Sequence, residues 1–447
     1  MKEDNNYSII RDNQFLQHGV RFFCLGMVIL LHLFVRNILG IGSPDIIVLL
    51  VNVFAFVMLN PYEALCFYCF LIPFKTGIGM HAITLMYCII YFLRKLKGKH
   101  IFVQKSFFLL IIVVCIELIN TLMGSANYAE WLRFSVYVVW LYTAWQVLDD
   151  CEWNSAFISS MIKCFLFSFT FAALVVLIVN SKNTSLIEVV SGTTRIGKTS
   201  NYSNLNDMLI SFHVNDLAVF CTSAVSFALV LIQNKHLKPV IGYALIGFYL
   251  FIGMLTQSRM FIVSLISIVV LIIVLQKRGR IKIIIPLILI VLAILYLYQN
   301  GFLPVIDEIM RRFKSTDMAT GNGRTEIIEI YNNLMLSHPL RTLIGFGVID
   351  YSTYTITEAA HNGTQEMILG IGILGSFCLL SWFIKIIFEA QSFAKKTLFQ
   401  NGFNYIPLVS LVLSMQFTQF LSQYHMLVLL LLTVVLIGLT DDGIMNK

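Results

Sequence analysis

Charged side chains are scarce in this sequence. Asp, Glu, Lys and Arg together make up 12% of the 447 residues, whereas hydrophobic residues make up 58%. Ordinary soluble domains contain about a quarter charged residues and about half apolar ones. A chain of this composition can show only a small surface to water. We therefore expect an all-α polytopic membrane bundle of about 12–14 transmembrane helices, with a large outer-face loop that contains short helices.

The sequence also lacks the pattern of a disulfide framework or of a metal site. Eight of the nine cysteines lie inside apolar runs, and only Cys151 lies in a polar connection. Cys66 and Cys69 have the CxxC spacing of metal ligands, but no second pair accompanies them. The outer connections hold no acidic cluster with metal-ligand spacing. We therefore predict no metal and no cofactor.

The net charge of +7 arises mainly from short connections between apolar runs. Basic residues gather in residues 94–105, 235–238, 277–282 and 395–396. Positive charge beside membrane spans marks the cytoplasmic side of the bilayer. We therefore expect the lipid bilayer as a partner, no nucleic acid, and both chain ends in the cytoplasm.

Apolar runs that reach or approach the length of a membrane span occupy most of the chain. They lie at 20–39, 101–123, 131–148, 156–180, 209–232, 238–256, 260–275, 281–299, 366–388, 405–421 and 424–440. Residues 44–93, interrupted by Asn60–Pro61 and Pro73, predict three short or tilted helices. The stretch before the first run is polar and has no signal-peptide cleavage site. We thus predict a cytoplasmic tail (1–19), one transmembrane domain (20–440) and a second cytoplasmic tail (441–447).

Counting spans from the basic connections places three segments on the outer side: 181–208, 256–259 and 300–365. The last of these is long and polar, which is typical of a functional loop. Within it, residues 305–314 have amphipathic spacing and either lie on the membrane surface or pack as an ordinary loop helix. A second helix is predicted over 326–336, ending before His338 and Pro339.

Residues 192–199 match the phosphate-loop pattern GxxxxGK[ST], but the surrounding sequence does not fit a nucleotide site. That motif needs a buried strand before it and a helix after it, and neither is indicated here. Arg195 within the segment is either a phosphate-binding residue or a solvated surface residue. We predict no ATP binding.

Several other polar residues lie near the ends of apolar runs. His213, Asn215 and Asp216 either line a cavity or form an interhelical hydrogen bond. Arg259 opens a span after a tight turn and either binds an anion or extends to lipid headgroups. For Glu117 and Asn120, which lie inside a span, we predict a structural polar contact.

The order of these features resembles the O-antigen ligase and polysaccharide polymerase superfamily of bacterial membranes. The resemblance covers about residues 190–390. One difference is that Ile327 or Ile328 stands where the family has an aromatic residue, usually tryptophan, with Tyr331 a turn later. The matching motifs are Ser258–Arg259 after a span, Gly323–Arg324 before a helix, HPL at 338–340, GFG at 345–347, His361–Asn362, GIGILG at 370–375, and Asn215 with Leu217–Ala218.

The resemblance implies a metal-independent glycosyltransferase of the bacterial cytoplasmic (inner) membrane, with its active site on the periplasmic or extracellular face. Its donor would be a glycan linked to a polyprenol, such as undecaprenol, through pyrophosphate. His361 is the candidate base, since the ordinary pKa of histidine is about 6.5. Arg259 and Arg324 are candidates to stabilise the leaving pyrophosphate. The predicted substrate-binding residues are Arg195, Asn215, His338 and Asn362.

Three functions remain open at this stage. The leading hypothesis is a polymerase that joins polyprenol-linked repeat units of a surface polysaccharide, either O-antigen or capsule. The alternative is an O-antigen ligase that moves the lipid-linked glycan of lipopolysaccharide to lipid A core or another acceptor. A lipid-linked glycan transporter is a weaker third, because transporters carry charged residues near the bilayer midplane. The expected partners are the polyprenol-linked donor and the glycan acceptor, together with a chain-length regulator and a repeat-unit flippase.

Overall fold

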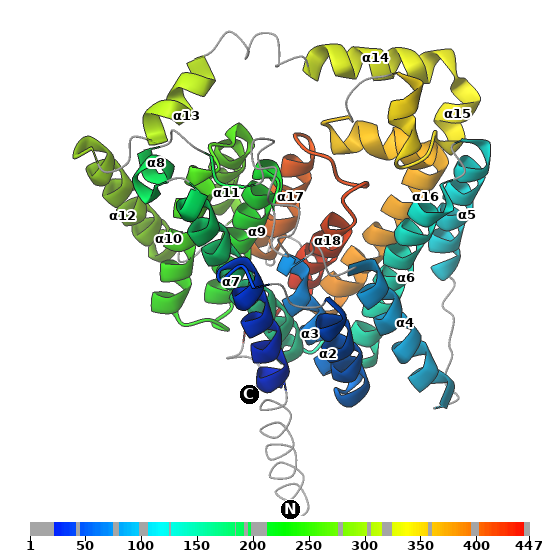
Figure 1. The fold of residues 1–447 in the computed structure, drawn as a ribbon, viewed down its shortest axis with the longest axis horizontal. Helices are drawn as coiled ribbons and strands as arrows, with labels where there is room; N and C mark the ends of the chain where they lie inside the picture. The colour runs from blue at the N-terminus through cyan, green and yellow to red at the C-terminus, as the bar shows by residue number, and fades with distance from the viewer. Residues whose placement is uncertain are drawn as a thin grey trace, which may run out of the picture.

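The fold is all-α, as predicted. The computed structural model describes residues 22–41, 45–74, 80–97, 106–124, 127–183, 185–191, 195–197, 212–275, 280–301, 305–314, 324–355, 360–394 and 402–441. These residues form helices and turns, and no strand occurs among them. Figure 1 shows the longer helices packed side by side, with three shorter ones, α13 to α15, across one end of the bundle. We call this the loop end and the opposite end the basic end.

The element bounds are as follows. The helices are Phe22–Asn37, α2 (Asp45–Met58), α3 (Pro61–Leu71), α4 (Met80–Lys97), α5 (Phe107–Met123), α6 (Tyr128–Asp150), α7 (Ser155–Asn183), α8 (Leu186–Ser191), α9 (Val214–Gln233), α10 (Pro239–Leu255), α11 (Arg259–Leu275), α12 (Arg280–Gln299), α13 (Val305–Lys314), α14 (Arg324–Ser337), α15 (Pro339–Ile344), α16 (Gly363–Phe393), α17 (Ile406–Met415) and α18 (His425–Val435). Short 3-10 turns occupy Ile72–Phe74, Asp350–Tyr354, Gly402–Tyr405 and Leu436–Gly438.

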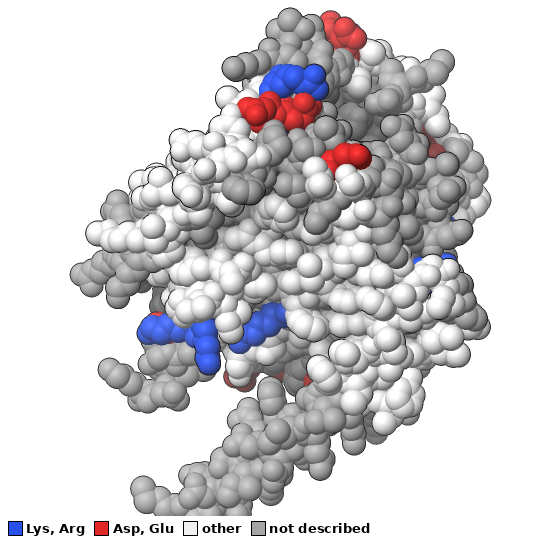
Figure 2. Space-filling view, turned by 60° about the vertical axis from the view of Figure 1, so that its left-hand side comes forward, with Lys and Arg blue, Asp and Glu red and all other residues white. Residues whose placement is uncertain are grey.

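The surface and the helix lengths both fit a membrane protein. Within the described residues, three helices are long and apolar enough to cross a bilayer: Ser155–Ser181, Val214–Gln233 and Gly363–Phe393. Shorter apolar helices accompany them along the chain. Figure 2 shows the described charged side chains of one face lying above and below a broad uncharged band. The chain is therefore a polytopic helical membrane bundle, and the number of its crossings stays a prediction.

Residues 44–93 contain the three helices that were predicted, α2, α3 and α4. The break before α3 is built by a capping box. The Asn60 side chain accepts the backbone N–H of Glu63 at 2.9 Å, and the Glu63 carboxylate accepts the N–H of Asn60 at 3.1 Å. Pro61 occupies the first helical position, where no N–H is needed.

The described parts of the basic connections gather at one end of the bundle. Lys95, near the end of α4, pairs with Asp150 at the end of α6 at 2.5 Å. Lys235, after α9, forms a 3.0 Å ion pair with the segment that follows α18. The hydroxyls of Ser155 and Thr440 join that segment to the start of α7 at 2.7 Å. Residues 98–105, 276–279 and 395–401 lie outside the described residues.

At the loop end, two glycine motifs meet through their backbones. Gly372 has φ +71° and ψ 177°, which kinks α16 and interrupts its hydrogen-bond ladder. The Gly370 carbonyl accepts the N–H of Gly347 at 3.0 Å. A Cβ at Gly372 would lie 2.4 Å from the nitrogen of Gly345, and one at Gly345 would lie 2.2 Å from the oxygen of Gly370. Only residues without side chains allow this approach.

Two polar residues of α5 hold the paired motifs in place. Asn120 donates to the carbonyl of Ile344 at 2.8 Å and to that of Gly370 at 3.2 Å. The Glu117 carboxylate accepts the N–H of Val348 at 2.9 Å. Both side chains are buried. The structural contact that the sequence predicted for Glu117 and Asn120 is therefore confirmed.

The apolar run at 405–421 is not one helix, and here the prediction was wrong. Glu366, fully buried in the first turn of α16, accepts the backbone N–H groups of Phe420, Leu421 and Ser422, the last two at 3.0 Å. It also accepts the hydroxyl of Ser422. These N–H groups are then not available to a helical ladder. Accordingly α17 ends at Met415, and residues 416–424 are irregular.

The amphipathic helix α13 packs on protein. Ile309 is buried, and Ile306 packs against the main core beside it. The helix contacts α10 and α11. On its exposed side, Arg311 forms an ion pair with Glu308 at 2.9 Å. The helix is thus packed on protein, while Met310 of its apolar face is 49% exposed, and a position on the membrane surface stays a prediction.

The glycine pairing predicts that Gly372→Ala destabilises the protein by more than about 2 kcal/mol, because it adds backbone strain and a clash with residue 345. The thermal midpoint of the purified protein in detergent measures this. Gly247→Ala is the matched control, since nothing lies within 4 Å of a Cβ at this α10 glycine. We expect the control to be neutral or stabilising by up to about 1 kcal/mol. Equal midpoints for the two variants would contradict the pairing.

We call the hydrogen bonds from residues 420–422 to the Glu366 carboxylate the Glu366 clasp. The clasp predicts faster amide exchange of these residues in Glu366→Gln. A glutamine amide turns a donor toward backbone N–H groups, so each hydrogen bond to the lost charge costs about 1.5–3 kcal/mol. Hydrogen–deuterium exchange of the peptide that covers 416–424 measures the change. The exposed Glu329 offers the control Glu329→Gln. Wild-type exchange in Glu366→Gln would show that the carboxylate does not hold the segment.

Candidate active site at the loop end

The sequence-predicted site residues lie in two groups at the loop end. Arg195, Asn215 and Arg259 surround the turn between α10 and α11, which we call the turn group. His361 and Asn362 lie at the start of α16, which we call the α16 group. Hydrogen bonds between residues far apart in the sequence hold the turn group together, and a helix cap holds the α16 group. The sequence motifs alone do not show these contacts.

The turn group centres on the connection from Thr256 to Ser258. Gln257 in its middle has φ +52° and is buried. Arg195 donates from Nε to the carbonyl of Thr256 at 3.0 Å, and the neighbouring N–H of Ile196 donates to Leu255 at 3.2 Å. The structure thus ties Arg195 to the turn and does not leave it as an isolated surface residue. Residues 192–194 and 198–211, which include most of the phosphate-loop match, lie outside the described residues.

Asn215 joins α9 to the same turn. The Ser258 hydroxyl donates to its side-chain oxygen at 3.4 Å. His213 caps α9 by accepting the N–H of Asn215 on Nδ1 at 3.3 Å. An interhelical hydrogen bond is therefore the alternative that the structure supports for Asn215. Arg259 is half-buried at the first position of α11, where the positive end of the helix dipole adds to its charge.

The α16 group is held by a small separate core. Tyr331, Leu334, Phe346, Tyr351, Ala360 and Leu369 form it, with the rings of Tyr331 and Tyr351 5.4 Å apart, edge to face. The Tyr351 hydroxyl accepts the N–H of Ala360 at 3.1 Å, which fixes the residue before His361. Burial, and then the nearby Glu366 carboxylate, raise the pKa of Tyr351. Tyr331 thus supplies a buried aromatic ring one turn after Ile327 and Ile328.

Asn362 ends the loop and begins α16. Its Oδ1 accepts the N–H groups of Thr364 and Gln365, each at 3.0 Å. This N-cap satisfies two donors that a helix start leaves unpaired. His361, directly before it, is half-buried. The imidazole is therefore carried at the positive end of a long helix.

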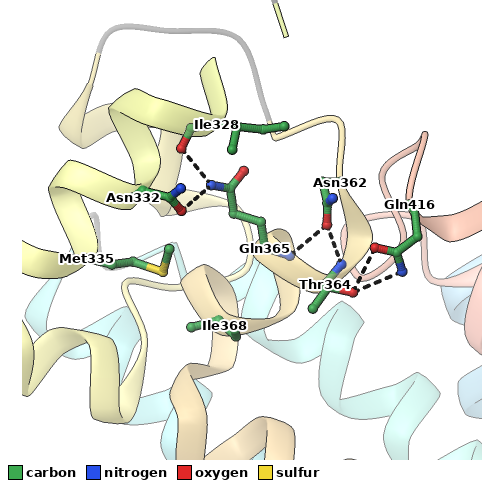
Figure 3. Close-up of a pocket in the computed structure, with 8 residues that line it drawn as sticks. All are labelled: Ile328, Asn332, Met335, Asn362, Thr364, Gln365, Ile368 and Gln416. Carbon is green, nitrogen blue, oxygen red and sulfur yellow. Dashed lines mark hydrogen bonds between the residues drawn. The ribbon is translucent and has the colours of Figure 1, made fainter. Parts of the chain in front are cut away.

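Beside the α16 group lies an open groove between α14, the start of α16 and the end of α17 (Figure 3). Its volume is about 280 Å³. Gln365 donates to the carbonyl of Ile328 at 2.9 Å and to the side-chain oxygen of Asn332 at 3.1 Å. The residues that line it are Ile328, Asn332, Met335, Asn362, Thr364, Gln365, Ile368 and Gln416.

Sequence reasoning missed most of this groove. Of its residues, only Asn362 was predicted as a site residue. Gln365 carried a weak signal, since it lies with Glu366 at the start of an apolar run, where polar side chains need partners. Asn332 and Gln416 carried none, because nothing in the sequence shows that α14 and the end of α17 meet the same turn of α16.

Two predicted site residues, Arg324 and His338, belong to neither group. Arg324 opens α14, as the sequence predicted, but its side chain lies outside the described residues. Its helix is joined to α16 one turn later, through Ile328 and Gln365. His338 is exposed at the start of α15, and its Nδ1 lies 2.9 Å from the Ser337 hydroxyl.

The two groups are connected through α17. The hydroxyls of Ser264 in α11 and Ser414 in α17 lie 2.8 Å apart. Two residues further along, the Gln416 side chain hydrogen-bonds the Thr364 hydroxyl at 3.0 Å. One short helix therefore links the span that Arg259 opens to the helix that follows His361. In the described part of the chain, no group of three or more His, Cys, Asp or Glu side chains is placed to hold a metal ion.

Comparison with known proteins gives one family match for this part of the chain. Residues 242–380 match the family model described as O-antigen ligase. The matched segment runs from α10 into α16 and includes Arg259, Arg324, His361 and the paired glycine motifs. No curated protein matches the chain. Residues 242–380 thus carry an O-antigen ligase domain match, which together with the all-helical membrane fold supports the O-antigen ligase-like family for this chain.

Proposed function

We propose that the protein is a glycosyltransferase that polymerises polyprenol-pyrophosphate-linked repeat units of a surface polysaccharide. The donor and the acceptor both carry the oligosaccharide repeat of an O-antigen or capsule. The reaction takes place on the outer face of the cytoplasmic membrane. The family match supports glycosyl transfer in general, and the arrangement of the loop end is the basis on which we assign roles to its residues.

The observation that carries the proposal is the placement of His361. It directly precedes Asn362, which lines the groove, and it shares the loop end with the helix that Arg259 opens. Arg324 opens α14, which forms another wall of the groove. Helix starts and arginines both attract phosphate oxygens. A candidate base and candidate anion-binding arginines thus lie at the same end of the bundle, on neighbouring but separate groups of helices.

In the proposed step, an acceptor hydroxyl gives its proton to a ring nitrogen of His361 while its oxygen bonds to the anomeric carbon of the donor. The bond from that carbon to the pyrophosphate oxygen breaks, and the electron pair leaves with the polyprenyl pyrophosphate. Arg259 and Arg324 stabilise the negative charge that develops there. The proposal requires no metal.

The remaining predicted residues take supporting roles in this proposal. Arg195 and Asn215 hold the donor pyrophosphate side of the site, since both bond to the turn that leads into Arg259. Asn362 fixes the helix start behind His361. His338 shapes the loop, because its ring nitrogen is taken up by Ser337 and by the carbonyl of Leu334 at 3.3 Å.

An O-antigen ligase is the second candidate, and the description of the matching family favours it. A ligase performs the same half-reaction at the donor and differs in its acceptor, which is lipid A core or another molecule. Both versions fit a chain-length regulator and a repeat-unit flippase as working partners. The nature of the accumulated glycan separates the two.

We expect His361→Ala to reduce glycan transfer by about 10²–10⁴-fold, because the acceptor hydroxyl loses its base. The variant is expressed in cells without the native gene, and surface and lipid-linked glycans are separated by size. Surface glycans of one repeat indicate a polymerase, and long chains retained on the polyprenol indicate a ligase. Asn333→Ala, at an exposed position of α14 outside the groove, is the control and should make wild-type glycan. Long, correctly attached glycan in His361→Ala would remove His361 from the mechanism.

We expect Arg259→Ala and Arg324→Ala each to slow donor turnover by about 10²–10³-fold, because each removes a cation that stabilises the leaving pyrophosphate. Release of polyprenyl pyrophosphate from purified lipid-linked donor, by protein in nanodiscs, measures this. Arg311→Ala is the matched control, an arginine at the same end that is paired with Glu308. Wild-type turnover by either variant would exclude that arginine from the reaction.

A further inference from the structure

The groove beside His361 has an unusual lining. Four of its eight residues are amides, namely Asn332, Asn362, Gln365 and Gln416, and none of the eight is charged. Figure 3 shows them around one opening, contributed by α14, α16 and the end of α17. Each amide offers both donors and an acceptor at fixed positions. Such a surface can pair with a ligand that is itself rich in donors and acceptors.

One polar atom of the lining, on Gln365, has no hydrogen-bond partner among the described residues. Its side chain is 8% exposed, and its amide nitrogen donates to Ile328 and Asn332. Among the described residues, no donor reaches its buried Oε1. A buried acceptor without a donor costs about 1–3 kcal/mol. A hydroxyl entering beside the Ile328 side chain, which is 38% exposed, would supply the missing hydrogen bond.

The other lining atoms favour a hydroxylated ring over a phosphate. With no Lys or Arg in the lining, the groove offers no charge to a pyrophosphate. Ile328, Met335 and Ile368 provide apolar side chains that suit the C–H groups of a sugar ring. The volume of about 280 Å³ is close to the lower limit for small-molecule sites.

We propose that this amide groove binds an uncharged sugar ring of the glycan acceptor. The inference rests on the proposed function and adds the place and chemistry of acceptor recognition. The position supports the acceptor and not the donor. Asn362 in the lining follows His361, the base for the acceptor hydroxyl. Of the proposed donor cations, Arg195 and Arg259 lie on a different set of helices, and Arg324 opens α14 one turn before the lining begins at Ile328. The groove places a neighbouring ring so that the attacking hydroxyl reaches His361.

The test uses the full protein in nanodiscs and a soluble probe. The probe is the repeat-unit oligosaccharide released by mild acid from the lipid-linked donor of cells without this gene. It has no pyrophosphate and can therefore act only as an acceptor. Saturation-transfer NMR measures its binding, and its extension from saturating lipid-linked donor gives the acceptor KM and kcat.

Asn332→Ala and Gln416→Ala should each weaken probe binding and raise the acceptor KM by about 3- to 10-fold, with kcat changed less. Asn332 is exposed, so the thermal midpoint of Asn332→Ala should match the wild type, whereas Gln416 is half-buried and Gln416→Ala also loses its hydrogen bond to Thr364. Asn333→Ala is the matched control, the exposed neighbour of Asn332 outside the lining. Gln365→Met should weaken binding most, because it removes both the unpaired acceptor and the donors.

Several outcomes would overturn the inference. Wild-type binding and acceptor KM in Asn332→Ala and Gln416→Ala would do so, and the proposed function would stand if His361→Ala still lost transfer. A raised KM for the lipid-linked donor with an unchanged acceptor KM would assign the groove to the donor instead. Weaker probe binding in the variants, combined with no transfer by the wild type, would support the sugar groove and reject the proposed function.

Discussion

The loop end depends on the close approach of two backbones, at Gly345 and Gly372. Because neither residue has a side chain, the carbonyl of Gly370 can accept the N–H of Gly347. The same carbonyl also accepts a hydrogen bond from the Asn120 side chain of α5. This joins the segment after α15 to the middle of α16. The first turns of α16 are thereby separated from its lower part, and they belong with the loop more than with the bundle. Everything that surrounds His361 is anchored to this joint.

A second constraint acts in the first turn of α16, before the kink at Gly372. Glu366 collects the N–H groups of residues 420–422 and so prevents α17 from continuing. The irregular segment that results brings Gln416 to Thr364. One buried carboxylate thus ends a helix, shapes a loop and completes a wall of the groove. Buried charges persist where several hydrogen bonds satisfy them.

Much of this arrangement could be read from the sequence because it follows from local rules. Apolar length and basic connections predicted the bundle and its two ends, and proline marked the break before α3 and the end of α14. The pairing of Gly345 with Gly372 could not be predicted, since glycine spacing says nothing about a partner elsewhere in the chain. The end of α17 was missed for the same reason. An apolar run predicts a helix unless a distant side chain takes its N–H groups, and Glu366 is about fifty residues away.

The candidate site divides in the same way. His361, Arg259 and Arg324 were predicted because histidine suits acid–base chemistry and arginine suits anion binding. The residue types of the groove amides do not indicate a particular chemistry. Only the fold shows that Asn332, Gln365 and Gln416 lie together.

The amide groove differs from the rest of the loop end in how freely its sequence can vary. The glycine pair and the Glu366 clasp tolerate little substitution, because backbone atoms or buried charges occupy the space around them. Asn332 is exposed and Gln416 is half-buried, and at exposed positions most substitutions cost the fold less than about 0.5 kcal/mol. The lining of the groove can therefore change at its exposed positions while the glycine pair and the buried Glu366 stay constant.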